Sequence, residues 1–442
     1  MNKARPKHKG ATAIYVAIML VVFIGIAALA VDIGHIMVVR NQLQNAADAG
    51  ALAGANALYL DNATAVNTGA NDVAYAVVTS NYADMFPVEV NSPDSNVDDV
   101  QRGHWSFTTH TFTRSDITTV PDALNATDTN LDYVNAVQVI AQRGPAIPAA
   151  SFFARIFNYM GFNMSTNAVA YNGFAGTILP GQATAPFALC EQSITDPNSG
   201  QYTCAKGRFI NSGSNAVTNQ TGYWTNEDNA PNNCLGLPPA SASSVGSLIT
   251  FPSSNSCSAA NTQVIYNDNW LVTNNGQMDT VYRNFWQCWV DSAGVNGQMP
   301  AVPWPLSVPV IDCTQQTCNQ MVGVVDVNVL WITDQNDPHY NNVPVQMARG
   351  TSSNSPVWTC PSYCSSPTYL ASNNFKYQGQ CCWYDQQNGF DTYFNLQNPD
   401  GTPATYQNDS IYIKPDCSRH DPKGETGGGP FGVTAGIPVL VK

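Results

Sequence analysis

The sequence predicts an α+β protein in which a membrane-length N-terminal helix carries a folded exterior. Three observations predict this class: an uncharged apolar run at 11–31, helical and alternating patterns over 33–180, and a cysteine-rich remainder. The 442 residues are 44% hydrophobic, which is enough to bury sizeable cores. We therefore divide the chain into a basic tail (1–10), an anchor with an extended helix (11–60), an α+β unit (61–180) and a β-rich, disulfide-stapled unit (181–442).

The run ATAIYVAIMLVVFIGIAALAV at 11–31 carries no charge. As a helix it spans roughly 31 Å, about the hydrocarbon thickness of a bilayer. A cleaved secretory signal is the alternative, since AALAVD resembles a cleavage site, but the run is longer than the usual apolar region of a signal. Lys3, Arg5, Lys7 and Lys9 precede the run, which predicts a single-pass membrane protein with a cytoplasmic N-terminus and an exported bulk.

The charge is uneven along the chain. The formal net charge is −13, yet the first 40 residues hold five basic residues against Asp32 alone. The exterior is therefore strongly acidic and would repel phosphate backbones, so we expect no nucleic-acid partner.

The segments after the anchor alternate between helical and strand patterns. Apolar positions continue the first helix to about residue 60, and a second amphipathic helix is predicted at 64–84. Alternation predicts strands at 103–112, 134–143 and 164–173, and helical spacing predicts a helix between Pro148 and Gly161. These elements form a helix-plus-antiparallel-sheet unit.

The last 262 positions, 181–442, are loop-rich, and the clearest strand is VVDVNVLWI at 324–332. An even number of cysteines in an exported region predicts disulfides of open connectivity, with Cys381 and Cys382 bonded to different partners. Zinc bound by Cys360, Cys364, the adjacent pair, Cys417 and His420 is the alternative, weakened by the lack of a CxxC motif. The glycine-rich stretch 424–432 is predicted to be a flexible connector before a final strand. The twelve probable disulfide cysteines are Cys190, Cys204, Cys234, Cys257, Cys288, Cys313, Cys318, Cys360, Cys364, Cys381, Cys382 and Cys417.

No common catalytic signature occurs in the sequence. HExxH, GxSxG and GxxxxGK[ST] are all missing. His104 and His110 share strand parity but would lie about 20 Å apart on a straight strand, too far for one metal, so we expect surface or half-buried residues. The oxygen-rich stretches 226–233 and 334–342 lack the spacing of a calcium loop. We expect no enzymatic activity, cofactor or metal.

Residues 10–58 resemble the N-terminal module of TadG-like proteins of the Flp (tight adherence) pilus-assembly system. The matching features are Gly10, AVDIG at 30–34 and LQNAADAGALAGA at 43–55, and residues 70–175 are similar to a second segment of that family. The resemblance implies an inner-membrane-anchored, pseudopilin-like protein that works with other pilus-assembly components, without catalysis. Pilin-type processing would cut between Gly10 and Ala11, although Tyr15 stands where glutamate is usual. The DxSxS metal motif of some relatives is missing.

One face of the first helix carries almost no side chains. Ala46, Gly50, Gly54 and Ala57 align there, which permits close approach of another helix and self-association, or packing on the protein's own sheet. Asp32, at the membrane edge, could pair with a partner's cation or act as an interfacial cap.

The alternative function is a membrane-tethered adhesin or ligand-binding module. Exposed aromatic side chains of the cysteine-rich unit would then contact the ligand, and Trp224, Trp270 and Trp358 are the candidates.

Overall fold

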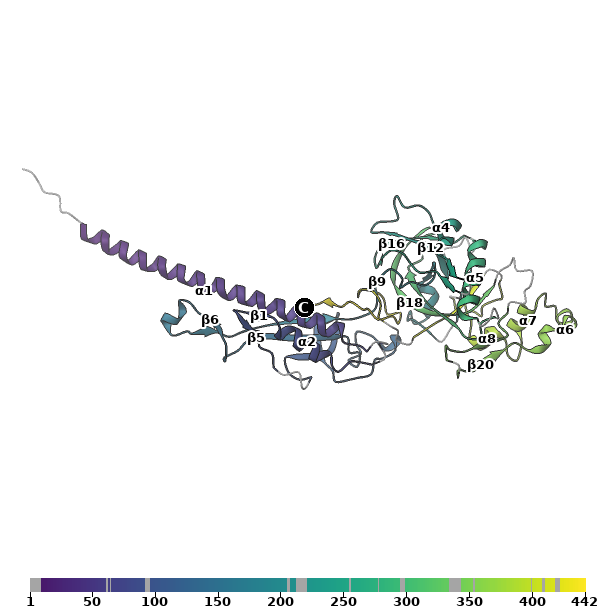
Figure 1. Cartoon of the computed structure of the whole chain (residues 1–442), viewed down its shortest axis with the longest axis horizontal. Coiled ribbons are helices and arrows are strands. Elements are labelled where there is room, and N and C mark those ends of the chain that lie inside the picture. The colour runs from purple at the N-terminus through teal and green to yellow at the C-terminus, as the bar shows by residue number, and fades with distance from the viewer. Residues whose placement is uncertain are drawn as a thin grey trace, which may run out of the picture.

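The computed structural model describes residues 9–60, 63, 65–91, 96–204, 207–211, 221–253, 256–276, 278–294, 299–333, 343–352, 354–398, 400–407, 410–417 and 422–442. A long helix, α1, enters a head that consists of two folded parts arranged end to end (Figure 1). The expected class is confirmed: a long apolar helix, a helix-plus-antiparallel-sheet unit, and a β-rich unit with disulfides.

Helix α1 runs without a break from Lys9 to Asn56. Its N-terminal half projects from the head and is exposed, and by length and composition it can cross a membrane (Figure 1). Its C-terminal half is buried, with Val39, Leu43, Ala47 and Ala51 fully covered. The predicted continuation of the anchor into the folded part is therefore confirmed, although the helix ends four residues before position 60.

The first part of the head is a five-stranded antiparallel sheet with helices on one face. The strand order is β22-β8-β5-β3-β4, and α1 and α2 (Ala70–Thr79) pack together against it. Alanine and valine dominate this core, which lets the helices lie close to the sheet. The strands are β3 (Val100–Ser106), β4 (Thr111–Arg114), β5 (Ala136–Arg143), β8 (Met164–Tyr171) and β22 (Val439–Leu440).

Three local predictions in this part were wrong in extent or type. The helix expected over 64–84 is only α2, because the chain then turns into a hairpin of β1 (Tyr82–Ala83) and β2 (Phe86–Pro87). The strand expected at 103–112 is two strands, since His110 takes a positive φ of 52° in the turn between them.

The helix expected between Pro148 and Gly161 is also wrong. The chain there forms a hairpin of β6 (Ala149–Ala150) and β7 (Gly161–Phe162), and its loop holds only a short 3₁₀ helix, η2 (Ala154–Phe157). Asn158 takes a left-handed conformation that ends this helix after one turn.

The second part is built on a seven-stranded sheet whose long strand β18 (Cys318–Thr333) pairs with β16, β17 and β21. The pairing of β17 with β18 closes β18, β16, β12, β10 and β17 into a ring. The predicted strand at 324–332 is confirmed inside β18. Its neighbours are β10 (Phe187–Cys190), β11 (Arg208–Asn211), β12 (Gly222–Ala230), β16 (Trp270–Asn274), β17 (Trp304–Ile311) and β21 (Ser410–Pro415).

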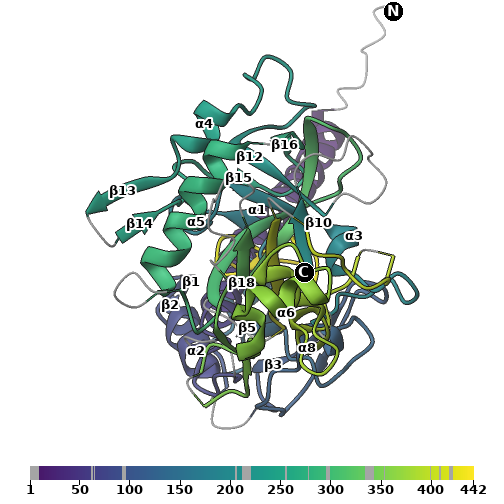
Figure 2. The ribbon, with the colours of Figure 1, turned by 90° about the vertical axis from the view of Figure 1, so that its right-hand side faces the viewer.

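Short helices and hairpins surround this ring, with α5 the longest helix (Figure 2). The helices are α3 (Glu191–Ile194), α4 (Ala242–Gly246), α5 (Asp279–Ala293), α6 (Pro367–Ser372), α7 (Gln378–Tyr384) and α8 (Phe390–Phe394), and short 3₁₀ turns lie at η1 (Ala123–Asn125) and η3 (Ser362–Ser365). Two-stranded pairs join β9 (Thr177–Ile178) to β15 (Ile265–Tyr266), β13 (Thr250–Ser253) to β14 (Ser256–Ser258), and β19 (Gln346–Ala348) to β20 (Val357–Thr359).

All twelve cysteines form disulfides in the second part. The pairs are Cys190–Cys313, Cys204–Cys417, Cys234–Cys318, Cys257–Cys288, Cys360–Cys382 and Cys364–Cys381. The expectation that Cys381 and Cys382 bond different partners is confirmed.

The C-terminal segment returns to the first part, so the final strand of the predicted 181–442 unit belongs to the first sheet. Strand β22 pairs with β8, and the stretch before it bridges to Phe174 and Ala175. The prediction of a flexible connector at 424–432 was wrong. A Cβ at Gly428 would lie 1.9 Å from the carbonyl oxygen of Ala175, so glycine serves close backbone packing there.

Candidate membrane-interface site

The end of the apolar run on α1 is bonded to the β6–β7 hairpin. Asp32 is only 5% exposed, and its carboxylate accepts hydrogen bonds from the backbone N–H groups of Phe152 (2.9 Å) and Ala154 (2.7 Å). The N–H of Phe153 and the hydroxyl of Ser151 complete the set at 3.2 and 3.5 Å. These are the N–H groups that a helix start leaves without partners, so Asp32 caps η2 from a distant helix.

A second carboxylate fixes the base of the same hairpin. Asp84 accepts the N–H of Ala150 at 2.9 Å and lies 3.3 Å from Nε2 of His35. The His35 ring in turn packs edge-on against Phe152, with 4.9 Å between ring centroids. Asp32 of α1 therefore holds the start of the loop, and Asp84, which lies beside His35 of α1, holds the base of the hairpin.

The loop held in this way, residues 151–160, exposes apolar side chains. Ile156 and Phe157 are each 77% exposed and Met160 is 73% exposed, and Phe152, Phe153 and Tyr159 are also exposed. We call these six residues the apolar loop. A contiguous exposed apolar patch of this kind marks a contact with a membrane or another molecule.

The small-residue face of α1 lies against the protein's own elements. A Cβ at Gly54 would meet the Ala74 Cβ of α2 and the Val137 Cγ1 of β5, each at 2.9 Å. A Cβ at Gly50 would meet the Val78 Cβ at 3.0 Å, and Ala46 is fully buried. Ala57 follows the end of α1 and is half-buried. Two uses were expected for this face: close contact with another helix in self-association, or packing within the protein itself. The structure shows the second use.

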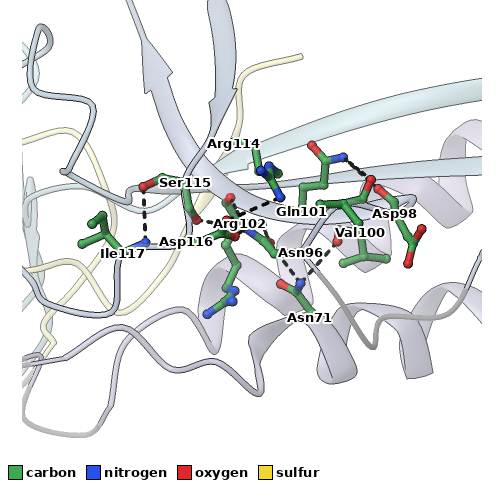
Figure 3. A network of polar contacts seen from close by, with 11 residues as sticks. Asn71, Asn96, Asp98, Val100, Gln101, Arg102, Arg114, Ser115, Asp116 and Ile117 are labelled. Atoms are coloured by element: carbon green, nitrogen blue, oxygen red, sulfur yellow. Dashed lines mark hydrogen bonds and ion pairs between the residues drawn. The ribbon is translucent and has the colours of Figure 1, made fainter.

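A polar cluster locks α2 against the sheet behind that face (Figure 3). The Asn96 side-chain amide donates to the carbonyl oxygens of Arg102 (3.0 Å) and Ser115 (2.9 Å) and to the Asp116 carboxylate (2.9 Å). Its oxygen accepts from the Asn71 amide of α2 at 3.1 Å. Burial lowers the pKa of the Arg102 guanidinium, and the nearby Asp116 and Asp72 oppose this shift. These partners are backbone groups and side chains of the same fold, so the cluster is structural.

The other predicted candidates are placed as follows. His104 is fully buried, against the expectation of a surface or half-buried residue, because its ring nitrogens lie 2.8 Å from the carbonyl oxygens of Tyr133 and Asp128. Trp224 and Trp358 are buried and Trp270 is half-buried, so they do not offer the exposed contacts that the adhesin alternative would need.

Some of the positions expected for processing or metal binding are described by the structure, and others lie outside the described residues. Gly10 and Ala11 lie within α1, and Tyr15 is 70% exposed on it. Residues 226–230 of the oxygen-rich stretch 226–233 form part of β12, whereas 334–342, His420 and most of the basic tail lie outside the described residues. Cys360, Cys364 and Cys382 bring their sulfurs within 4.8 Å of one another, but all three are bonded in disulfides, not free as zinc ligands.

A cleft of about 410 Å³ lies where the two parts of the head meet. Its lining includes Asp128, Tyr171 and Phe174 from the first part and Tyr202 and Phe431 from the second. The Asp128 carboxylate is desolvated, yet hydrogen bonds from Thr108, Phe107 and Ser106 lower its pKa to about 2. The Asp128 carboxylate already accepts hydrogen bonds from the turn between β3 and β4, so its role in the cleft is structural.

The fold and the site define a class of protein: a folded, disulfide-bonded head carried on one continuous helix that is long and apolar enough to cross a membrane. Residues 10–57 match the family of putative Flp pilus-assembly TadE/G-like proteins, and residues 43–170 match the putative Tad-like Flp pilus-assembly family. Over residues 10–170, the chain is therefore similar to Flp pilus-assembly proteins of the Tad families. Comparison with curated proteins and with solved structures finds no match to this chain.

These families indicate involvement in Flp pilus assembly, and they are structural or assembly components. The two matched segments overlap at residues 43–57, in the half of α1 that packs against the first sheet. Sequence reasoning missed the apolar loop as an exposed surface. The signal that could have found it is a stretch without acidic residues in an acidic protein, since none occurs between Asp132 and Glu191.

Proposed function

We propose that this protein is a pseudopilin-like component of Flp pilus assembly that acts through contact, without catalysis. It is anchored in the bacterial inner membrane by α1, with its N-terminus in the cytoplasm and its head in the periplasm or at the cell surface. The observation that carries the proposal is the continuity of α1, whose exposed half can span a membrane and whose other half is the central helix of the family-matched core.

Continuity of the helix has a mechanical consequence. Because no loop separates the anchor from the core, a displacement of the membrane helix is transmitted to the head as a rigid-body movement. Contacts that other assembly components make with the exposed half of α1 can therefore position the head. We propose the same exposed half, and not the buried Gly50–Gly54 face, as the surface for any self-association.

The proposal is tested in cells that produce Flp pili. Deletion of the gene is expected to reduce piliation, and the full-length protein is expected to restore it. A chain in which residues 11–31 are replaced by a cleaved secretory signal should reach the periplasm and fail to restore pili. Normal piliation in the deletion strain would overturn the role in assembly.

The N-terminus of the membrane-extracted protein separates the forms of this role. A start at Ala11 would show pilin-type processing despite Tyr15 and would favour a filament-associated subunit. A start at Met1 would show a permanent anchor with its basic tail in the cytoplasm. A start near Val31 would show removal of the anchor and would contradict the proposed membrane attachment.

The adhesin alternative receives no support from its expected contacts, because Trp224 and Trp358 are packed in the core. Binding of cells or matrix by the purified protein would be needed to revive it.

A further inference from the structure

We propose that the apolar loop (Phe152, Phe153, Ile156, Phe157, Tyr159 and Met160) inserts into the lipid bilayer beside α1 and forms a second, monotopic membrane contact. This inference rests on the proposed anchoring of α1. The proposed binding partner of the loop is the boundary region between the lipid headgroups and the acyl chains.

The apolar loop lies beside the end of the uncharged run of α1. The loop is bonded to Asp32, the first residue after the uncharged run 11–31, and that run is roughly as long as a bilayer is thick. If α1 crosses the membrane, Asp32 lies at the outer boundary of the hydrocarbon. The β6–β7 hairpin also occupies the end of the head nearest to the projecting half of α1 (Figure 1).

The hairpin is buried at its base and exposed in its loop. Ala149, in the hairpin base, is fully buried in the core of the first part, whereas the side chains of the loop beyond it are exposed. The exposed apolar surface continues on α1 itself, where Val31 and Ile33 flank the buried Asp32. The loop therefore extends the lipid-facing surface of the proposed anchor.

The charge of the loop differs in sign from that of the protein as a whole. The protein is acidic overall, but the loop contains no carboxylate and carries one exposed basic residue, Arg155. The Nε of Arg155 donates to the carbonyl oxygen of Ser151 at 2.8 Å, and the next residues of the loop, Ile156 and Phe157, are exposed and apolar. A cation placed in this way can reach lipid phosphates while the apolar side chains enter the acyl region.

The backbone of the loop has a defined conformation. The loop holds its shape through its own hydrogen bonds: Ser151 Oγ accepts the N–H of Arg155 at 3.1 Å, and the carbonyl of Ala154 accepts the N–H of Tyr159 at 3.2 Å. Together with the Asp32 cap, these bonds fix the backbone while the side chains point outward. Insertion would therefore require little ordering of the loop.

The experiment places an environment-sensitive fluorophore on single added cysteines in the full-length protein. All twelve native cysteines are in disulfides, so only the added thiol reacts. The sites are Ile156→Cys in the loop, Met19→Cys in the exposed half of α1, and Ala371→Cys on α6 at the far end of the head (Figure 1). Each labelled protein is reconstituted in phosphatidylcholine–phosphatidylglycerol vesicles with and without nitroxide-labelled acyl chains.

The expected result is a blue-shifted emission that nitroxide lipids quench at positions 156 and 19, with neither effect at 371. Quenching at 19 alone would overturn the loop contact and leave the anchor intact. Quenching at neither position would contradict the anchoring itself. A label at 156 that is shielded from aqueous iodide but not quenched by lipid would show contact with a second copy in place of lipid and would overturn the proposal.

A charge variant supplies the second measurement. Ile156→Asp combined with Phe157→Asp should abolish lipid quenching of a label at Met160→Cys, while a label at Met19→Cys keeps its quenching. Val345→Asp, at an exposed apolar position of the second part, is the matched control and should change neither signal. Unchanged quenching at position 160 in the double variant would overturn the proposal.

Discussion

The carboxylate of Asp32 lies 2.7 Å from the backbone nitrogen of Ala154, which joins the end of the apolar run to a loop 122 positions later in the chain. This contact joins two separate elements, helix α1 and the β6–β7 hairpin. The carboxylate is buried, and most of its hydrogen-bond donors are backbone N–H groups of the hairpin loop.

Asp32→Ala should release the hairpin loop. The change removes charge-assisted hydrogen bonds to Phe152, Phe153 and Ala154 and leaves their N–H groups without an acceptor, so the local stability of the loop should fall. Hydrogen exchange of the detergent-solubilised protein should therefore accelerate at residues 151–157.

Asp48→Ala is the matched control on the same helix. Asp48 accepts only the Gln44 amide one turn away, at 2.7 Å, so its loss should leave the loop unchanged. Equal exchange in the two variants would show that Asp32 does not hold the loop.

Gly54→Ala should destabilise the first part of the head. The new methyl group would lie 2.9 Å from Ala74 and Val137, and the overpacking should cost about 1–3 kcal/mol, more than the helix propensity that alanine contributes. Gly34→Ala is the control, because no described atom lies within 4 Å of the position of its Cβ. That variant should stabilise α1 by up to about 1 kcal/mol. Chemical denaturation in detergent measures both, and the same sign of change for both would contradict the packing argument.

The sequence predicted the elements whose periodicity is set by burial on one face. Strand β5 and the buried half of α1 are examples. In β5 the buried Val137 and Val139 alternate with the half-buried Gln138 and Ile140, and in α1 Leu43 recurs with Ala47 at helical spacing. The prediction failed where a contact distant in the chain decides the local structure.

The β6–β7 hairpin illustrates that failure. Phe152, Phe153 and Ile156 have helical spacing, but the N–H groups at the start of that segment are bound by Asp32 of α1, and Asn158 ends the helix after one turn. The pairing of β22 with β8 has the same origin, because nothing local in 437–442 identifies a partner strand more than 260 positions earlier. The disulfide pairing could not be predicted for the same reason.

Arg143→Lys should loosen the β1–β2 hairpin. The buried guanidinium of Arg143 donates to the carbonyl oxygens of Ala83, Phe86 and Pro87, and a lysine cannot reproduce its fork of donors. The unsatisfied carbonyls should cost about 1–3 kcal/mol. Arg114→Lys is the control, since Arg114 forms a solvent-exposed pair with Asp116 at 3.4 Å and such pairs contribute little. Equal loss of stability in both would contradict this assignment.

Glu227→Gln should make the second part less sensitive to pH. Burial of Glu227 in β12 raises the pKa of its carboxyl from 4.5 to about 8; the backbone N–H of Thr262 opposes the rise, and the charge of Asp228 adds to it. The folded state therefore holds a proton that the unfolded state loses above pH 4.5, so this residue destabilises the fold progressively as the pH rises from about 4.5 to about 8.

Glutamine retains the shape of the protonated side chain and cannot ionise, so the variant should unfold at a higher temperature than the wild type at pH 8. The difference corresponds to at most about 4 kcal/mol and should vanish near pH 4.5. Thermal unfolding across this range measures the effect, with Glu191→Gln, at an exposed glutamate of the same part, as the control that should not change the pH profile. Parallel pH profiles for the wild type and Glu227→Gln would mean that Glu227 is ionised in the folded protein, with its buried charge stabilised by its surroundings.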